Sequence, residues 1–556
     1  KVNIDNSGSG STQKGVFAYG GLRLGGTGIY GLNLTNYSTP SIVFNITPTS
    51  AGFADMGQIW SKPTKAKIKT TTSSTDTGTD VLIFGGGYDP CYEAQDFQVG
   101  ATSPTTAEAT ADAALAEGSR KNIKVWSDSC KTKATTKTAG NAVYMINAKT
   151  GALIWSATKS ANSVGANSTN PYLNSSIVGG ITTLDRNNDG FVDHIYFADL
   201  AGQVFRADFT NAGDSIYEKN SSGNYVGTKQ TGFAGQRITR LLQPIYPVAN
   251  TTGAITANTN AKFNLRLYER PVVSFYRNEQ KNNALFALVN VISGDRSSPL
   301  SKIRTSSTNA DRVYGLIDTD ITKANSIFFA KDFTTTNTNK QTVVDLSDSD
   351  LTNIPTALGT AIPVPSATRT IAIGNMTSGS KKGWYYPLTR FDGYSNVLYN
   401  KGVGKSEVVN SMLYTTVYNP DMSYGTADPC SAKVVGGSER ELYCLPWGIC
   451  TDADSRTGTG GFLQAGQGIQ ELTLGPYSST NANVRLLIGN LTLANRANNR
   501  VNYGSDSSKD SSLIYSNQLS GGNSAISQTG GDGSAAEYLY RERYTLTPRT
   551  WYETFR

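Results

Sequence analysis

The chain has 556 residues, a formal net charge of +7 and only 17% charged residues, a length that allows several domains or one large repetitive architecture. It contains 56 glycines, 29 tyrosines and a single histidine. This composition favours a β-rich extracellular protein over a helical cytosolic enzyme. The Lys and Arg residues form no run that would mark a nucleic-acid groove, so we expect no nucleic-acid partner.

No apolar run approaches the roughly 18 to 20 residues that a transmembrane helix needs. The longest candidate, Ala284–Ile292, predicts a buried strand instead, and we expect no transmembrane segment. The sequence begins at Lys1 without an initiator Met or a signal peptide, which indicates a mature product or a fragment of a longer protein.

Short apolar or alternating segments separated by turn residues predict strands along most of the chain. In chain order they lie at 16–46 (two or three strands), 66–69, 81–84, 143–146, 152–155, 195–200, 203–209, 271–275, 284–292, 313–317, 327–329, 383–388, 407–417, 470–474 and 484–488. Segment 210–235 is polar and predicts a loop. One short surface helix is expected at 107–115, inside an Ala- and Thr-rich insertion at 91–130.

This pattern predicts an all-β fold, a β-propeller of about seven irregular blades that spans residues 1–556. Recurrent endings of the form aromatic-x-Leu/Ile-Asp/Asn indicate a repeated four-stranded unit, and radial packing protects the edges of such small sheets. Seven blades would take about 80 residues each, against roughly 40 to 50 in compact repeat families, so we expect long loop insertions. Segment 521–556 reads as a flexible stretch followed by a basic C-terminal tail.

Five cysteines occur without a CxxC pair or histidine partners for zinc, which in an exported protein predicts disulfides. The closest partners in sequence are Cys91 with Cys130, which would clamp the insertion, and Cys444 with Cys450. Cys430 is the remaining cysteine, and its pairing with Cys444 or Cys450 stays open as an alternative.

The most specific stretch is 185–193, where oxygen-bearing side chains alternate around Gly190. A hard cation such as Ca2+ takes six to eight oxygens, and a short loop supplies them from alternate positions. Gly190 permits the sharp turn that lets the next carbonyl face the ion. The predicted ligands of one Ca2+ are Asp185, Asn187, Asp189, the carbonyl of Phe191, and Asp193.

The loop differs from an EF-hand, because the position of the bidentate Glu is taken by Tyr196 and the flanks predict strands rather than helices. We therefore expect a strand-loop-strand site. A polar hairpin is the alternative, since Asn-Asp-Gly is also ordinary turn chemistry. A turn accounts for Asp189 and Gly190, but not for the spacing of Asp185, Asn187 and Asp193.

In this order along the chain, six segments resemble the C-terminal β-propeller domain of the PilC/PilY-type type IV pilus-associated adhesins. They are GGLRLGGTGIYGL (20–32), VLIFGGGYD (81–89), YMINAKTG (144–151), DRNNDGFVDHIYFADLAGQVFRAD (185–208), GDRSSPL (294–300) and GWYYPL (383–388). In that family the D-x-N-x-D-x-x-x-D loop binds one calcium, which implies the same role for 185–193. The family's large N-terminal region, which carries much of its adhesive function, is absent from this sequence.

The resemblance further implies a protein exported through the periplasm to the cell surface, at the outer membrane or the pilus tip. There it would support pilus extension against retraction, adhesion and twitching motility. The implied partners are minor pilins at the pilus tip, the absent N-terminal region and, as a further candidate, a host surface.

We expect no enzymatic activity. Lys149-Thr150-Gly151 followed by Trp155 is similar to the repeat of propeller quinoprotein dehydrogenases, but it is clear only once. His194 is the only histidine and no G-x-S-x-G elbow is present. An integrin-like receptor propeller is a second alternative, although such domains repeat the calcium loop and here Asp318-x-Asp320 and Asp452-x-Asp454 lack its glycine.

Overall fold

The computed structural model describes residues 2–5, 15–116, 119–162, 164–306, 308–334, 340–354, 366–391, 397–409, 411–421, 436–449, 462–469, 487–492 and 534–538. Strands dominate these residues, and they form several small sheets. The chain divides into two compact units. Unit 1 comprises 1–277, 284–289 and 317–347, and unit 2 comprises 278–283, 290–316 and 348–556.

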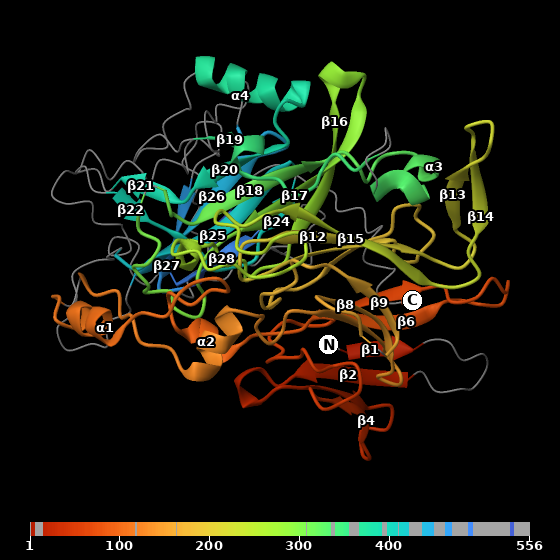
Figure 1. Cartoon of the computed structure of the whole chain (residues 1–556), viewed down its shortest axis with the longest axis horizontal. Helices are drawn as coiled ribbons and strands as arrows, with labels where there is room; N and C mark the ends of the chain where they lie inside the picture. Colours follow the sequence, from red (N-terminus) through yellow and green to blue (C-terminus); the bar gives the residue numbers. More distant parts are fainter. Residues whose placement is uncertain are drawn as a thin grey trace. The chain divides into compact units, whose positions relative to one another are not determined.

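Three sheets of unit 1 are built from strands that follow one another in the chain (Figure 1). The first has the order β1 (Val2–Asp5), β2 (Gly15–Gly21), β3 (Ile29–Asn33), β4 (Ser41–Ile46). The second has the order β5 (Thr64–Ile68), β6 (Thr79–Gly85), β7 (Val143–Asn147), β8 (Leu153–Thr158), β9 (Ala166–Thr169). The third has the order β10 (Thr182–Leu184), β11 (His194–Ala198), β12 (Val204–Thr210), β15 (Ala234–Leu242). All neighbours pair antiparallel except β8 and β9.

The apolar faces of these sheets form the core of unit 1. One cluster joins side chains of the second and third sheets, among them Val81, Met145, Trp155, Phe197 and Phe205, each of which is fully buried. β11 and β12 are buried along their whole length, including the polar side chains His194, Arg206 and Asp208, which pair with one another. At roughly 25 cal/mol per Å² of buried apolar surface, this packing is the main source of stability for the sheet behind the 185–193 loop.

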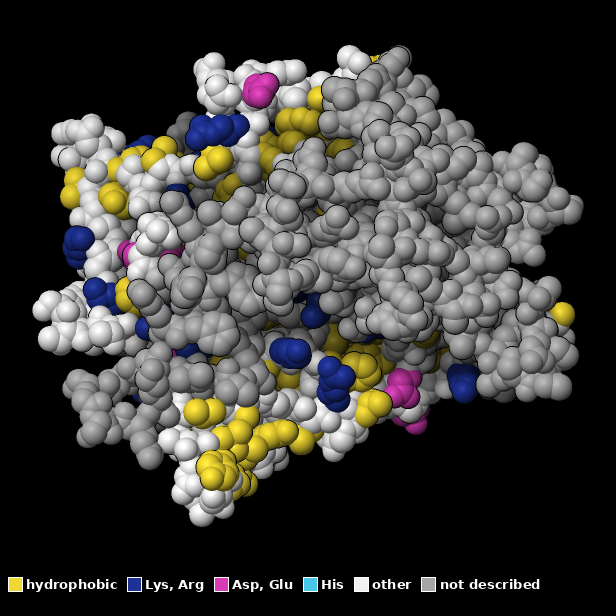
Figure 2. Space-filling model, turned by 180° about the vertical axis from the view of Figure 1, so that it is seen from behind, with side chains coloured by type: hydrophobic (Ala, Val, Ile, Leu, Met, Phe, Trp, Pro, Cys, Tyr) yellow, Lys and Arg dark blue, Asp and Glu magenta, His cyan; other side chains and the backbone are white. Residues whose placement is uncertain are grey.

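The first sheet leaves apolar side chains in contact with solvent. Figure 2 shows hydrophobic side chains gathered at the lower edge of the view, where this sheet lies. Leu24 and Ile42 are 70% and 72% exposed, and Tyr37 is 90% exposed. The opposite side of the same sheet packs inward through Tyr19, Ile29 and Phe44.

The insertion at 91–130 carries the helix that the sequence predicts and a second one that it does not. α1 (Thr106–Ala113) begins with a capping box between Thr105 and Glu108. α2 (Asp128–Ala134) begins at Ser127, whose hydroxyl accepts the N–H of Cys130. Short 3₁₀ helices occur at Arg23–Gly25, Pro90–Glu93, Ala261–Phe263 and Lys331–Thr334.

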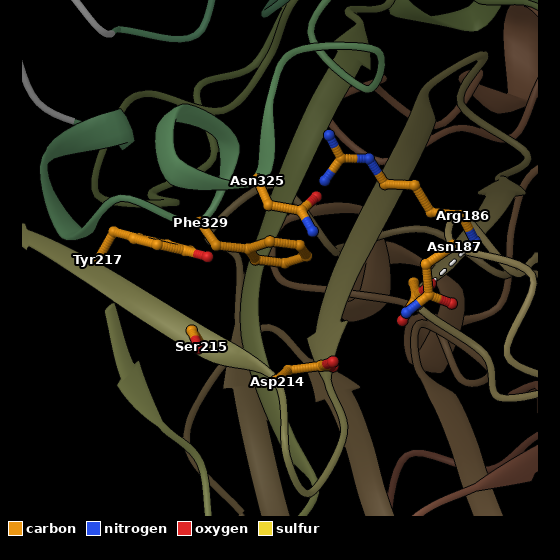
Figure 3. Close-up of a pocket in the computed structure, with 8 residues that line it drawn as sticks. Arg186, Asn187, Asp214, Ser215, Tyr217, Asn325 and Phe329 are labelled. Carbon is orange, nitrogen blue, oxygen red and sulfur yellow. Dashed lines mark hydrogen bonds between the residues drawn. The ribbon is translucent and has the colours of Figure 1, made fainter. Parts of the chain in front are cut away.

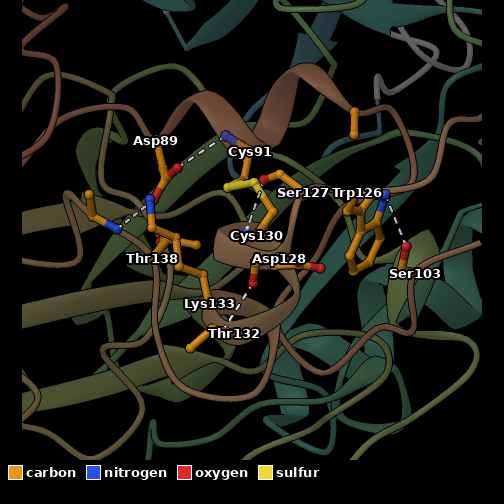
Figure 4. Close-up of a disulfide and its surroundings, with 12 residues drawn as sticks. Asp89, Cys91, Ser103, Trp126, Ser127, Asp128, Cys130, Thr132, Lys133 and Thr138 are labelled. Atoms are coloured by element: carbon orange, nitrogen blue, oxygen red, sulfur yellow. Dashed lines mark hydrogen bonds and ion pairs between the residues drawn. A yellow bond between two sulfur atoms is a disulfide. The ribbon is translucent and has the colours of Figure 1, made fainter.

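The disulfide predicted between Cys91 and Cys130 is confirmed (Figure 4), with a Cα–Cα distance of 5.6 Å. It joins α2 to the 3₁₀ turn that follows β6. Beside it the buried carboxylate of Asp89 accepts the N–H groups of Cys91 (3.0 Å) and Ala139 (2.7 Å) and pairs with Lys133 Nζ at 2.8 Å. Cys444 is also disulfide-bonded, and its predicted partner Cys450 lies outside the described residues, as does Cys430.

Two predictions about unit 1 are wrong. Segment 210–235 was expected as a loop but contains the hairpin β13 (Ser215–Lys219) and β14 (Tyr225–Lys229) and the start of β15. Residues 327–329 were expected as a strand but lie in and after the helix α3 (Asn325–Phe328). Figure 1 shows the hairpin beside α3, and Tyr217 N–H donates to the Phe329 carbonyl at 3.0 Å.

Three strands each have residues in both units: β16 (Val272–Asn278), β17 (Ala284–Ile292) and β18 (Arg312–Asp318). Within unit 2, β20 (Gly383–Pro387) pairs antiparallel with β18 and parallel with β19 (Thr352–Asn353). A second sheet contains β23 (Lys401–Gly402), β25 (Met412–Asn419), β26 (Gly437–Cys444) and β27 (Phe462–Gln467), and β24 (Glu407–Val409) pairs with β25.

The remaining elements of unit 2 are smaller. β21 (Thr389–Phe391) pairs with β22 (Val397–Tyr399), and β28 (Leu487–Thr492) pairs with β29 (Ser534–Tyr538). α4 (Ser366–Ser378) was not expected from the sequence, and 3₁₀ turns occur at Glu279–Lys281 and Asp348–Asp350. The predicted strand at 470–474 and most of the tail at 521–556 lie outside the described residues.

Trp384 anchors the core of unit 2. Its ring is fully buried against Tyr386 and Tyr443, and its Nε1 donates to the Pro446 carbonyl at 2.9 Å. Gly448 fits over this ring because a Cβ there would lie 2.7 Å from it. The segment after Cys444 is therefore held by the tryptophan as well as by its disulfide.

The architecture agrees with the predicted β-rich class. Small sheets of sequential antiparallel strands have the topology of propeller blades. The propeller itself and its seven blades stay a prediction. Among the helices of the described residues, none has the length and apolar character needed to cross a membrane.

Candidate metal centre

The predicted calcium loop connects two paired strands. β10 ends at Leu184 and β11 begins at His194, and these two residues face each other in the antiparallel register. Asn188 and Gly190 adopt left-handed conformations, with φ of 61° and 89°, which allows the chain to turn twice within the loop. The strand-loop-strand arrangement expected from the sequence is thus present.

Carboxylate and amide oxygens hold the loop by accepting backbone N–H groups. Asp185 accepts from Gly190 at 2.7 Å and from Asp189 at 3.2 Å. The Asn187 side-chain oxygen accepts from Asp189 at 3.1 Å, and Asp189 accepts from Phe191 at 2.9 Å. Asp185, Asn187 and Asp189 are therefore brought together on the inner side of one turn, and Asn187 and Asp189 are exposed to solvent.

Phe191 fixes the far side of the loop. Its ring lies against Gly78 on the turn before β6, so closely that a Cβ on Gly78 would lie 2.4 Å from it. The next residue, Val192, donates its N–H to the Lys67 carbonyl at 2.9 Å. The predicted carbonyl ligand of Phe191 is thus attached to the second sheet as well as to the third.

Asp193 differs from the other ligands because it is 3% exposed. Its carboxylate accepts the Arg186 N–H at 2.8 Å and the Asn211 amide at 3.3 Å. The pKa of Asp193 is raised to about 7, mainly by burial. The carboxylates of Asp214, Asp189 and Asp185 act in the same direction, and the hydrogen bond from the Arg186 N–H opposes them. Four acidic side chains of unit 1, those of Asp185, Asp189, Asp193 and Asp214, therefore lie close enough to act on one another.

The donor set fits a hard divalent cation in chemistry, and its five predicted oxygen ligands are fewer than the six to eight that Ca2+ takes. Three carboxylates, one amide oxygen and one carbonyl are the oxygen ligands that Ca2+ takes, and a cation would offset the mutual repulsion of the carboxylates. Within the described ranges no three His, Cys, Asp or Glu side chains already converge as in a closed metal site. To bind the ion, these side chains would therefore have to give up hydrogen bonds from backbone N–H groups and point their oxygens at the ion instead.

A small pocket of about 30 Å³ adjoins the loop. Figure 3 shows the residues around it, which come from three separate segments of unit 1. The loop contributes Arg186, Asn187 and Asp193, the start of the β13–β14 hairpin contributes Asp214, Ser215 and Tyr217, and α3 and the residue after it contribute Asn325 and Phe329. Sequence reasoning missed Asp214 and Arg186, because the hairpin was expected as a loop and α3 as a strand.

Behind the loop lies a buried ionic cluster. His194 Nδ1 and Arg206 Nε each lie 2.8 Å from Asp208 Oδ1, Arg237 Nε lies 2.7 Å from Asp208 Oδ2, and Arg206 Nη1 lies 2.6 Å from Asp318 Oδ2. Burial lowers the pKa of His194 although Asp208 accepts from it, so the ring is neutral at pH 7. His194 accordingly supports the strand after the loop.

Phe328 of α3 connects this cluster to the loop through cation-π contacts. The guanidinium carbons of Arg186, Arg206 and Arg237 lie 4.7, 5.1 and 4.5 Å from its ring centre. Asp318 is used here as an ion-pair partner, and the side chain of Asp320 accepts from Lys323, Thr342 and Val343. These two aspartates therefore stabilise unit 1, while Asp452 and Asp454 lie outside the described residues.

The segment that is similar to the quinoprotein repeat forms the tight turn between β7 and β8. The Asn147 side chain accepts the N–H groups of Lys149 and Thr150 at 2.8 and 3.1 Å. Gly151 adopts a φ of 74° and contacts Phe44. This geometry is that of an Asx-stabilised turn.

No protein-family model matches the chain, and no curated protein matches it. Among solved structures, the chain is similar to the C-terminal domain of Pseudomonas aeruginosa PilY1, with 13% sequence identity and a TM-score of 0.47. The likeness covers 88% of this chain and 81% of that one.

Proposed function

We propose that this chain is a calcium-binding β-propeller domain of the PilC/PilY type, which acts at the cell surface in type IV pilus biogenesis, adhesion and twitching motility. The 185–193 loop is the observation that supports calcium binding. It supplies oxygen donors at alternate positions between two paired strands, and the carboxylates of Asp189 and Asp185 raise the pKa of Asp193 beside them. The pilus part rests on the six sequence segments that resemble the family.

The proposed ligands of one Ca2+ are Asp185, Asn187, Asp189, the Phe191 carbonyl and Asp193. Bound calcium would neutralise carboxylates that otherwise repel one another and would hold the loop closed. We expect a dissociation constant on the order of 10⁻⁶ to 10⁻⁴ M, because the bidentate acid of an EF-hand is absent. Magnesium should substitute poorly, since it requires strict octahedral geometry and loses its water reluctantly.

Calorimetric titration of the purified chain with CaCl2 tests the calcium site. Substituting Asp189→Ala removes a ligand from the centre of the loop and should abolish measurable binding, while the buried β11 and β12 keep the sheet folded. In the wild type, calcium at a hundredfold excess over its dissociation constant should add about 2.7 kcal/mol to the free energy of unfolding.

The matched control is Asp128→Ala, which removes one exposed carboxylate from α2 in the same unit. It should leave the calcium affinity unchanged. Absence of a calcium heat in the wild type, or equal stabilisation by magnesium, would refute the proposed metal.

A further inference from the structure

We infer that Asp214, which lies outside the predicted loop, supplies a further carboxylate to the proposed calcium ion. The inference rests on the proposed function and adds a ligand from the turn between β12 and β13. The loop offers five ligands, and Ca2+ takes six to eight oxygens. The position at which an EF-hand carries its bidentate Glu is occupied here by Tyr196, which is fully buried and donates to Asp318.

Asp214 is placed beside the loop by direct contacts. It lines the same pocket as Asn187 and Asp193, and in Figure 3 its carboxylate points across the pocket toward the segment that carries Asn187. The two segments are joined by Asn211, whose N–H donates to Asp214 Oδ2 at 2.6 Å and whose amide donates to Asp193 Oδ1 at 3.3 Å. One residue therefore contacts both carboxylates, Asp214 through its backbone N–H and Asp193 through its side-chain amide.

Hydrogen bonds to two neighbouring segments fix the position of Asn211 and therefore that of Asp214. The Asn211 side chain donates to the Val192 carbonyl at 3.1 Å and accepts the Lys69 N–H at 2.9 Å. Ala212 N–H in turn donates to the Lys69 carbonyl at 3.0 Å. Because Asp214 uses only Oδ2 toward Asn211 in the described part of the chain, Oδ1 can face the cation after a small rotation of the side chain.

A ligand at this position would connect calcium to the hairpin. β13 begins at Ser215, directly after Asp214. The Tyr217 N–H of this strand donates a hydrogen bond to the carbonyl of Phe329, the residue that follows α3. Calcium bound by both segments would therefore order the start of the hairpin as well as the loop. A calcium ion bound by the loop alone would leave the hairpin unchanged.

The test compares Asp214→Asn with Glu218→Gln by calorimetric titration with CaCl2. Asn keeps an oxygen for the Asn211 N–H but loses the charge, so the dissociation constant should rise at least about tenfold. Glu218→Gln removes a charge from the same hairpin at an exposed position and should bind calcium as the wild type does. An affinity of Asp214→Asn within twofold of the wild type would overturn the inference.

Hydrogen exchange of the wild-type chain gives a second readout that does not depend on the variant folding. Adding CaCl2 should slow exchange in 185–193 and also in 211–219. Slowing in 185–193 alone would reject Asp214 as a ligand and leave the proposed calcium loop intact. Absence of any calcium binding by the wild type would instead reject the proposed function and this inference together.

Discussion

Three buried aspartates of the third sheet and its turns show how partners decide the state of a carboxylate. Burial alone would raise the pKa of Asp208, but the guanidinium groups of Arg206 and Arg237 outweigh it and hold that pKa well below its usual range. Asp193 and Asp199 form no ion pair with another described residue, and the pKa of each is raised to about 7, mainly by burial. Asp208 is thus a permanent anion, whereas the other two titrate near neutral pH.

Asp199 predicts a pH dependence of stability. Its side chain accepts the N–H groups of Ala201 and Gln203 at 3.0 and 2.9 Å and the Gln203 amide at 2.7 Å. Its folded pKa of about 7 lies above its ordinary value of 3.8, so between these values the folded state binds the proton and the unfolded state does not. The free energy of unfolding should therefore fall as pH rises from about 4 to 7, by on the order of 4 kcal/mol for this group.

The measurement is urea denaturation of the wild type and of Asp199→Asn at intervals between pH 4 and 8. Asn cannot titrate, so the stability of the variant relative to the wild type should rise over this range and become constant above pH 7. The Asn amide would face the Gln203 amide, which Arg240 holds through Gln203 Oε1 at 2.9 Å, so the variant should be less stable than the wild type at pH 4. A difference that does not change with pH would show that Asp199 is ionised throughout.

At the scale of the element, the disulfide holds α2 on unit 1. It closes a loop with a sequence separation of 39, and the chain-entropy treatment gives about 4 kcal/mol for a loop of this length. Replacing both cysteines, Cys91→Ser with Cys130→Ser, should therefore lower the free energy of unfolding by about 2 to 4 kcal/mol. The midpoint of denaturation by urea checks this.

The same double variant should keep the calcium affinity of the wild type, because the disulfide and the 185–193 loop share no contact among the described residues. Dithiothreitol also opens the disulfide of Cys444, so reduction of the wild type should lower the free energy of unfolding at least as much. No change of the midpoint in either experiment would show that Asp89, with its contacts to Lys133 and Ala139, holds α2 without the disulfide.

The sequence predicted correctly those elements that are specified by local features, such as apolar segments and turn residues. The β11–β12 hairpin was predicted because two apolar runs flank Ala201-Gly202, and Gly202 does adopt the left-handed φ of 82° that the turn requires. α3 was mistaken for a strand because a short apolar run has no period of its own. Its helix is stabilised by distant groups, since Arg186, Arg206 and Arg237 surround Phe328.

The β13–β14 hairpin was missed for a related reason. Its strands are largely exposed on both faces, so the alternation of apolar and polar residues that marks a half-buried strand is absent. Its attachment to the rest of unit 1 depends on Tyr217 and on residues more than a hundred positions later. Asp214 could not be recognised as a neighbour of the loop for the same reason, although Asp185 to Asp193 could be read from their spacing alone.

At the scale of the whole molecule, local patterns specify sheets but not how many of them form a ring. The sheets made of sequential strands could be predicted, because antiparallel neighbours are joined by short turns. The number of blades is decided by which distant sheets pack side by side, and strand periodicity carries no information about such packing. The proposed calcium loop is the feature of unit 1 through which the proposed function can be tested in cells.

The last prediction concerns that test. In cells that assemble type IV pili and depend on this protein, Asp189→Ala should fold and reach the envelope but give fewer surface pili. The proposed function gives the reason, since in it the calcium-bound loop forms the surface that supports pilus extension against retraction. Deleting the retraction motor in the same cells should restore the pili, and Asp128→Ala should behave as the wild type. Surface pili counted by electron microscopy and twitching zones measured on agar give the readout. Normal piliation and twitching by a variant whose calcium loss is confirmed would mean that the ion only stabilises the loop between β10 and β11.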